Sequence, residues 1–234
     1  MKTIGILGGL GPQATMDFEM RVHRVAQRLI PPQGNSGYPP MIVYYQRQPP
    51  FVMSDPRTPV FPLQLNPVLF EAAQWLGPKV DFLVITANGP HMAQAQIEQA
   101  AGRKVLSMIE ITLEEVQRRG WRKIGVLGFG DPRVPAYTQP LSQLHLAYES
   151  IEMELQAQLN EAVLKLMEGR EDAESTEVAR QSIATLRARE IDGIILGCTE
   201  IPLLLHQEVD EPDLINPAQL LAEAAVRYAL NVEC

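Results

Sequence analysis

The residue with the clearest chemical potential is Cys198, which follows the apolar run Ile191–Gly197 and precedes Thr199 and Glu200. A cysteine between a strand end and a helix start lies near backbone N–H groups that lower its pKa, and a thiolate is both a base and a nucleophile. Glu200 would orient a neighbouring base or favour the helix N-terminus electrostatically. The alternative is a buried structural thiol, the usual state of a lone cysteine. The pattern makes Cys198 a candidate catalytic residue.

A second cluster of small and polar residues follows another apolar run, Val80–Thr86. Both clusters precede a predicted helix, so backbone N–H groups together with the side chains of Asn88 and Thr199 would bind a carboxylate. N-capping of the helices explains either side chain by itself, and both interpretations stay open. His91 would polarise a ligand or serve only as a polar cap.

An internal repeat relates the two clusters. Ile4–Gly8 (IGILG) recurs as Ile124–Gly128 (IGVLG) 120 positions later, and Val80–Ala87 recurs as Ile191–Cys198 111 positions later. Two similar offsets in the same order indicate that the chain consists of two homologous halves. The period is far too long for the short stacked repeats of a solenoid. Under this alignment Ala87 is the counterpart of Cys198.

Alternating apolar runs and helical periodicity predict the elements that must position these residues. The predicted strands are Thr3–Leu7, Met41–Tyr45, Val80–Thr86, Lys104–Ser107, Lys123–Leu127 and Ile191–Gly197, and the predicted helices are Pro12–Ile30, His91–Ala101, Ile111–Arg119, Gln156–Met167, Ser175–Arg189 and Pro217–Leu230. Near-continuous apolar strands are typical of parallel sheets covered on both faces. We therefore predict an α/β fold of two pseudo-twofold-related lobes, each a mostly parallel sheet flanked by helices, with an active-site cleft between them.

Two further segments bear on the site. The first is the glycine-rich run Gly8-Gly9-Leu10-Gly11-Pro12, which lacks both the GxGxxG pattern and the Walker lysine of nucleotide-binding turns. It therefore predicts a tight turn that brings the N-terminus of the next helix to the ligand. Gly9 and Gly11 are the substrate-binding positions predicted in this turn. Ten of the 19 prolines fall between Pro31 and Pro67. Such a segment is neither continuous helix nor central sheet, and we favour a surface connection over an ordered flap above a cleft.

Composition limits the class of protein. The chain has 234 residues, a formal net charge of −8 and 46% hydrophobic residues, which is enough for a substantial core. The acidic balance argues against binding nucleic acid or an anionic membrane. Two cysteines form no disulfide framework, no Cys/His cluster has metal-site spacing, and the short N-terminal apolar run does not resemble a signal segment. We expect a cytoplasmic protein without a metal.

At these residues the chain resembles the aspartate/glutamate racemase family, the cofactor-independent racemases that include hydantoin racemases. The resemblance spans essentially the whole sequence and is carried by Ile4–Pro12 with Ala14-Thr15, by Leu196–Pro202, and more weakly by Asn88 with His91. It implies two α/β lobes, a C-terminal helix that returns to the first lobe, homodimers, a small carboxylate or amino-acid ligand and no cofactor. We place the lobes at residues 1–103 with 212–234 and at residues 104–211. The family mechanism uses two cysteines on opposite faces of the α-carbon, one as base and one as acid.

The sequence departs from this family pattern at its most important position, because Ala87 stands where the first cysteine is expected. The family's Pro-Asp-Arg-Thr stretch has its nearest counterpart in Asp55–Thr58, which leaves Arg57 as an accessory carboxylate-binding candidate and Arg47 as a weaker one. Gly89 replaces a threonine, Met167 a lysine and Phe129 another threonine. These changes replace polar or cationic groups with small or apolar ones, which disfavours a dicarboxylic amino acid as substrate.

Three functions fit these residues. The first is a racemase or epimerase in which Cys198 is one base and Thr86, His91 or a water serves the other face. The second is a one-base decarboxylase or isomerase similar to the arylmalonate decarboxylases, which keep a cysteine only in the second half. The third is a non-catalytic ligand-binding relative. The sequence favours an isomerase, with Asn88, Gly89, Thr199 and Glu200 as further substrate-binding positions.

Overall fold

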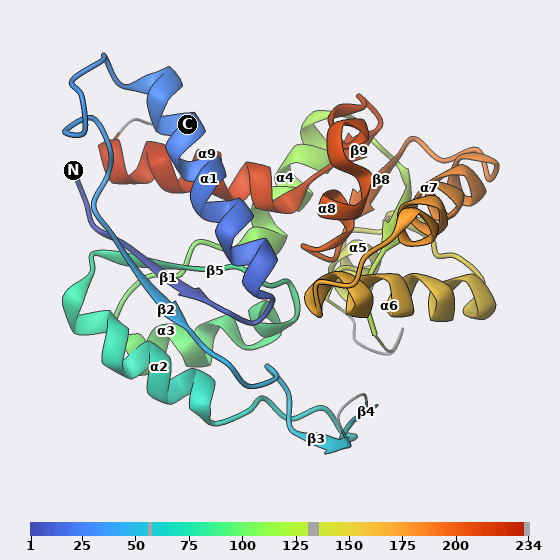
Figure 1. The fold of residues 1–234 in the computed structure, drawn as a ribbon, viewed down its shortest axis with the longest axis horizontal. Coiled ribbons are helices and arrows are strands. Elements are labelled where there is room, and N and C mark those ends of the chain that lie inside the picture. Colours follow the sequence, from blue (N-terminus) through green and yellow to red (C-terminus); the bar gives the residue numbers. More distant parts are fainter. Residues whose placement is uncertain (56–57, 131–135, 232–234) are drawn as a thin grey trace. The chain divides into compact units, whose positions relative to one another are not determined.

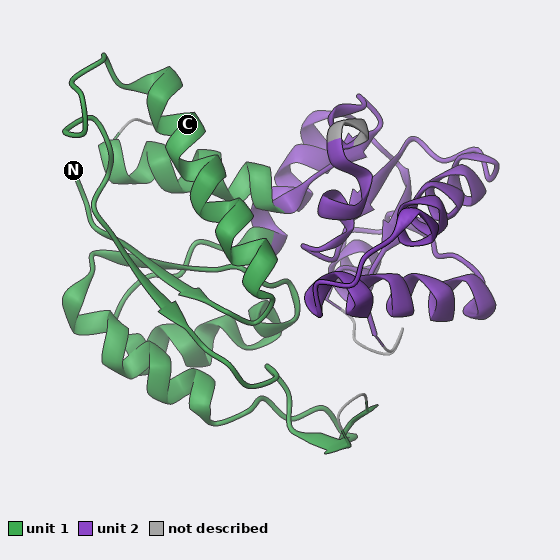
Figure 2. Ribbon diagram, in the orientation of Figure 1, with its two compact units in different colours: residues 1–108, 218–234 green, residues 109–217 purple. Residues whose placement is uncertain are grey.

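The computed structural model describes residues 1–55, 58–130 and 136–231, and the chain divides into two compact units. Unit 1 comprises residues 1–108 and 218–234, and unit 2 comprises residues 109–217 (Figure 2). The sequence placed the first boundary after residue 103 and the second after residue 211, so both lie a few residues later than predicted. No described helix is both long and apolar enough to cross a membrane.

Unit 1 contains a three-stranded parallel sheet in the order β2-β1-β5, formed by Met41–Tyr45, Ile4–Gly8 and Phe82–Ile85. Its helices are α1 (Pro12–Leu29), α2 (Val68–Leu76), α3 (Gln94–Ala101) and α9 (Pro217–Leu230). Figure 1 shows α1 and α9 on one side of this sheet and α2 and α3 on the other. Leu7, Leu83 and Ile85 pack with α2 and α3, whereas Phe82 makes an edge contact with Tyr228 of α9 at 4.8 Å between ring centroids.

Unit 2 contains a four-stranded parallel sheet in the order β7-β6-β8-β9, formed by Ala147–Glu149, Lys123–Leu127, Gly193–Leu196 and Leu214–Ile215. Its helices are α4 (Met108–Arg118), α5 (Thr138–Gln143), α6 (Met153–Met167), α7 (Ala173–Arg187) and α8 (Ile201–Leu205). Leu127 and Leu196 of the sheet join α6, α7 and α8 in one hydrophobic cluster that also includes Cys198. The predicted α/β fold with parallel, helix-flanked sheets is confirmed.

The repeat is visible in the strand registers of the two units. Ile4 pairs with Phe82, and the repeat-equivalent Ile124 pairs with Gly193. In each unit an aspartate directly precedes the later of these two strands, Asp81 before β5 and Asp192 before β8. Its carboxylate accepts a backbone N–H at the start of the earlier strand. Thr3 N donates to Asp81 at 2.6 Å, and Lys123 N donates to Asp192 at 2.9 Å. The equivalence extends through both strands, so Ala87 and Cys198 each lie two residues beyond the last strand residue.

Several predicted elements differ from the structure. Lys104–Ser107 is not a strand: a single bridge joins Val105 to Leu83, flanked by hydrogen bonds from Leu83 N to Lys104 O and from Leu106 N to Leu83 O. The predicted helix His91–Ala101 is a 3-10 turn, Gly89–Ala93, followed by α3. The predicted helices missed α2, a nine-residue helix that begins beside Pro67, at the end of the proline-rich segment.

The later part of the proline-rich segment is a hydrogen-bonded extension that carries a short hairpin of β3 (Met53–Asp55) and β4 (Thr58–Pro59). Its base is closed by hydrogen bonds from Val52 N to Gln64 O at 2.8 Å and from Asn66 N to Pro50 O at 2.9 Å. The segment therefore has hydrogen-bonded structure of its own between β2 and α2.

Candidate active-site turns

The turn after β1 is held by one buried hydroxyl group. Thr15 Oγ1 accepts the Gly9 N–H at 2.8 Å and donates to the Gly11 carbonyl at 3.0 Å. A Cβ on Gly8 would lie 2.5 Å from Thr15 Cγ2. Gly9 has φ of 77°, and a Cβ there would lie 2.7 Å from the backbone N and O of Gln46. Any larger residue is thus excluded at both positions, and the Gly9 N–H is already used inside the turn. Gly11 precedes α1 with an extended φ of −135°.

Thr86, an accessory candidate for proton transfer, belongs to the same network. Its Oγ1 lies 2.9 Å from Thr15 Oγ1, and the residue is 1% exposed. Either hydroxyl can donate in this pair, and Thr86 is the donor when the Thr15 hydroxyl donates to the Gly11 carbonyl. The Thr86 hydroxyl is therefore part of the hydrogen-bonded network that holds the turn after β1. No role for Thr15 was predicted from the sequence, although a hydroxyl residue one turn into a helix that follows glycines is a usable signal.

The turn after β5 contains Ala87, Asn88 and Gly89. Ala87 is half-buried and its methyl group carries no transferable proton. Asn88 is buried at the N-cap position of the 3-10 turn but makes no side-chain capping hydrogen bond, so the capping interpretation is wrong for it. Gly89 is covered by the ring of Phe51, whose Cε2 and Cζ would lie 3.0 Å from a Cβ at this position.

His91 is a structural residue beneath this turn. It is buried, and its Nε2 lies 3.4 Å from the Ile85 carbonyl oxygen. Burial lowers the pKa of His91 to about 4, so the imidazole is neutral at pH 7. The neutral ring, hydrogen-bonded to the last residue of β5, holds the turn against the end of this strand. The structure adds no support for His91 as a residue that serves the second face of the substrate.

The turn after β8 brings three buried polar side chains together. The Cys198 thiol donates to Glu200 Oε2 at 3.2 Å, and Thr199 Oγ1 donates to the same oxygen at 3.0 Å. Cys198 is 6% exposed and Glu200 is 3% exposed. The second oxygen of Glu200 has no hydrogen-bond partner among the described residues. Thr199 bonds to Glu200 and so is not a helix cap.

The pKa of Cys198 shifts in the direction opposite to the one predicted. Burial raises it well above its ordinary value, and the charge of Glu200 raises it further. The backbone N–H groups of Glu200 and Ile201 act in the other direction, but α8 has only five residues and a correspondingly small dipole. Burial also raises the pKa of Glu200. The resting form is a neutral thiol hydrogen-bonded to a buried carboxyl group.

The end of β2 supplies a residue that sequence reasoning missed. Gln46 N donates to the Gly8 carbonyl at 2.8 Å, and Gln46 Oε1 accepts the Arg47 N–H at 2.9 Å. The side chain is buried, and its Nε2 has no hydrogen-bond partner within residues 1–55, 58–130 and 136–231. Arg47 is exposed and lies over the Tyr45 ring at 4.7 Å, and Arg57 lies outside the described residues.

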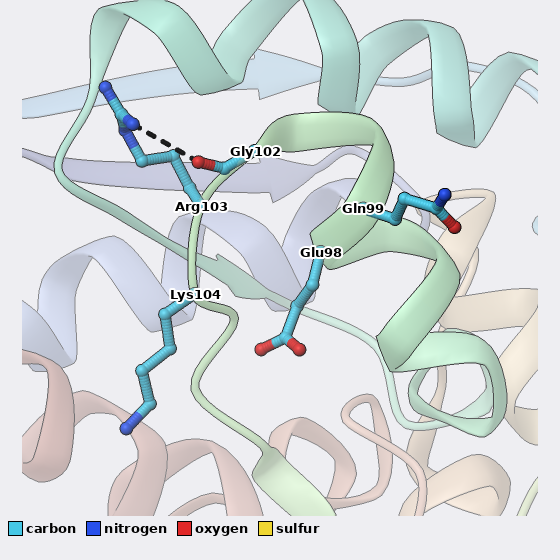
Figure 3. Close-up of a pocket in the computed structure, with 5 residues that line it drawn as sticks. All are labelled: Glu98, Gln99, Gly102, Arg103 and Lys104. Carbon is cyan, nitrogen blue, oxygen red and sulfur yellow. Dashed lines mark hydrogen bonds between the residues drawn. The ribbon is translucent and has the colours of Figure 1, made fainter.

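A surface pocket elsewhere in unit 1 contains none of these residues. It is lined by Glu98, Gln99, Gly102, Arg103 and Lys104, after the last turns of α3 (Figure 3). Arg103 donates to the carbonyls of Gly102 and Val80, the latter just before β5 begins. The pocket therefore lies near the start of β5, whereas the candidate turns follow the ends of the strands.

The sequence profile of a family described as Asp/Glu/Hydantoin racemase matches residues 7–225. The chain belongs to this family. It is 24% identical over 224 residues to the broad specificity amino-acid racemase RacX of Bacillus subtilis, covering 95% of this chain and 96% of RacX.

Solved structures of the family share this fold. An aspartate racemase homologue from Pyrococcus horikoshii superposes with a TM-score of 0.76 at 23% identity, covering 98% of this chain and all of that one. The aspartate racemase of Picrophilus torridus gives a TM-score of 0.73 at 17% identity, with 98% and 94% covered. The family predicted from the motifs is confirmed, and racemases and isomerases among its members support an isomerase in general terms.

Proposed function

We propose that this protein is a cofactor-independent isomerase that moves a proton at the α-carbon of a small carboxylic or amino acid, with Cys198 as the proton carrier. The observation that carries the proposal is the buried hydrogen bond from the Cys198 thiol to Glu200 Oε2. A carboxylate in that position can accept the thiol proton and leave a thiolate base. Family membership supplies the reaction class.

The proton transfers balance without an additional reactant. Glu200 takes the proton of Cys198, and the thiolate then removes the α-proton to leave an enediolate and a neutral thiol. When the Cys198 thiol exchanges its proton with solvent and then returns a proton to the same face, solvent hydrogen enters the α-position and the configuration is retained. Glu200 then gives its proton back to the thiolate, which restores the starting protonation states. Inversion needs a donor on the opposite face, and Ala87, the repeat counterpart of Cys198, supplies none. In an epimerising enzyme a water would fill that role.

A second candidate is a one-base decarboxylase or isomerase, favoured by the neutral state of Cys198. Here the bond from the α-carbon to a carboxylate breaks, carbon dioxide leaves, and the electron pair stays on the α-carbon as an enediolate. A neutral thiol then protonates one face of the enediolate. Ala87, with only a methyl group, fits this chemistry because no acid is needed on the other face.

Proton exchange in deuterated buffer tests the proposal. We would follow the α-hydrogen signal of a panel of amino and carboxylic acids by NMR, together with carbon dioxide release from malonates. The proposal predicts α-deuteration or decarboxylation of at least one acid, abolished in Cys198→Ala and unaffected in the matched control Cys234→Ala. Turnover that survives Cys198→Ala would exclude Cys198 as the proton carrier. Binding of an acid without any turnover would support a ligand-binding protein instead.

A further inference from the structure

An exposed aromatic ring lies at the strand edge that carries Cys198. Leu127 of β6 pairs with Leu196 of β8, so Phe129 and Cys198 each lie two residues beyond this pair. Phe129 is 39% exposed. A single exposed phenylalanine needs no explanation on a general surface. At the carboxyl edge of a parallel sheet, where ligands of α/β proteins bind, an exposed ring is a candidate contact.

The backbone around Phe129 is held in place by α6. Gln156 Nε2 donates to the Gly128 carbonyl at 3.0 Å, and Asn160 Oδ1 accepts the Gly130 N–H at 3.0 Å. Asn160 Nδ2 also reaches the Gly130 carbonyl at 3.3 Å. These bonds fix the residues on both sides of Phe129 while its ring stays partly in solvent. An apolar contact presented on a fixed backbone loses little entropy when a ligand covers it.

The turn of unit 1 has an aromatic neighbour of its own. The Phe51 ring covers Gly89, two residues beyond Ala87, and Phe51 is fixed by an antiparallel bridge to Leu65. This observation is independent of Phe129, because it concerns a different unit and a different segment. Both strand-end turns therefore have a phenylalanine beside the position that the repeat assigns to proton transfer.

Charge near Cys198 opposes a second carboxylate on the ligand. Glu200 is buried beside the thiol, and a dianionic ligand would bring another negative charge toward it. Lys165 of α6 lies little more than one turn beyond Asn160, but its Nζ is paired with Asp172 at 3.0 Å and with Glu174 at 3.5 Å. This lysine is thus neutralised by two carboxylates of the protein.

We propose that the substrate is an amino or carboxylic acid with an apolar, preferably aromatic, side chain, and that Phe129 contacts that side chain. This inference takes the reaction from the proposed function and adds which class of acid the protein binds. Burial of an aromatic group against a ring favours such a ligand over an equally small diacid.

Binding of two achiral probes that give no net reaction, phenylacetate and succinate, tests the proposal by calorimetry on the whole chain. We expect phenylacetate to bind at least about tenfold more tightly than succinate. Phe129→Ala should remove most of this preference, Phe129→Leu should keep part of it, and Met153→Ala, at a residue of α6 that is 84% exposed, should leave it unchanged. Circular dichroism would show that each variant is folded.

The outcomes separate this proposal from the proposed function. Tighter binding of succinate, no binding of phenylacetate, or a preference that Phe129→Ala leaves intact would each overturn the aromatic assignment. A preference lost in Phe129→Ala, in a protein that exchanges no α-proton of phenylalanine or phenylglycine, would keep the assignment and contradict the isomerase. Faster exchange of aspartate than of phenylalanine would contradict the assignment and keep the isomerase.

Discussion

The proposed chemistry depends on two buried, hydrogen-bonded side chains, Cys198 and Glu200. The sequence identified both residues and the alanine at the repeat-equivalent position. It gave the wrong direction for the cysteine pKa, because that value depends on the hydrophobic cluster around the thiol and on where the carboxylate points. Thr15 and Gln46 were missed for the same reason, since their importance comes from burial and from partners on other segments.

Replacing Glu200 separates its charge from its ability to accept a proton. Glu200→Gln keeps a hydrogen-bond acceptor beside the thiol but removes the negative charge that raises the pKa of Cys198. We expect the alkylation rate of Cys198, measured against pH in a Cys234→Ser background, to rise at lower pH than in the parent. We expect α-proton exchange to fall, by roughly tenfold or more, because the proton acceptor is lost.

These two measurements distinguish a proton acceptor from a structural carboxylate. A purely structural Glu200 would leave exchange unchanged, or faster because more thiolate is present. Glu200→Asp, which keeps an acid at a shorter reach, should recover part of the exchange. If the pH dependence of Cys198 alkylation is the same in Glu200→Gln as in the parent, the charge of Glu200 does not raise the pKa of Cys198.

At the scale of elements, strongly patterned strands and long helices were predictable, whereas short elements were not. β2, β6 and α9 have the predicted boundaries because each is a continuous apolar run or carries a sustained helical period. Lys104–Ser107 has the same local pattern as a strand, yet only a single bridge joins it to β5. Pairing of this kind is a tertiary property that local composition does not contain.

The hydroxyl of Thr15 should be required for the turn between β1 and α1. Thr15→Val keeps the shape of the side chain but leaves the buried Gly9 N–H without its acceptor. We expect a loss of about 1–3 kcal/mol in the free energy of unfolding, measured by urea denaturation. Thr15→Ser, which keeps the hydroxyl, should lose clearly less. Equal losses in the two variants would show that the methyl group, not the hydrogen bonds, stabilises the turn.

The aspartate that precedes β8 should make stability depend on pH. The backbone N–H groups of Arg122 and Lys123 lower the pKa of Asp192 in the folded protein. A carboxyl group with a lowered folded pKa contributes stability above its unfolded value of about 3.9, and this contribution is lost as pH falls through the folded pKa. Because Asp192 is exposed and solvent screens its charge, Asp192→Asn should reduce the free energy of unfolding by only about 0.5 kcal/mol at pH 7 and by less near pH 3.

The control for this prediction is Glu190→Gln, an exposed acid two residues earlier in the chain. We expect that variant to match the parent at both pH values in thermal denaturation. A loss in Asp192→Asn that is the same at pH 3 and pH 7 would show that the charge of Asp192 does not contribute.

At the scale of the whole molecule, one backbone plan occurs twice, but only the copy in unit 2 has a cysteine at the turn after its second repeated strand, where unit 1 has Ala87. The matching registers of β1 with β5 and of β6 with β8 support the repeat down to single residues. The repeat was readable from the sequence because both copies keep the glycine of the first strand and the aspartate before the second. At each glycine a Cβ would lie 2.8 Å from a side-chain atom, Val80 Cγ2 at Gly5 and Ile191 Cδ1 at Gly125.

Restoring the second thiol tests this asymmetry. Ala87→Cys places a proton carrier at the counterpart of Cys198, and we expect the variant to produce both configurations from a single enantiomer more rapidly than the parent. Ala95→Cys, on an exposed position of α3, is the matched control and should not change the stereochemistry. A folded Ala87→Cys protein with the product configuration of the parent would contradict the equivalence of the two positions.

The most direct test of the account is a crystal structure with a bound carboxylate ligand such as phenylacetate. If Cys198 carries the proton, the α-carbon of the ligand will lie within about 3–3.5 Å of Cys198 Sγ, the distance that proton transfer requires. The hydrogen bond from the thiol to Glu200 should be present or replaced by a contact from Sγ to the ligand. An α-carbon bound well away from Cys198 would contradict the account.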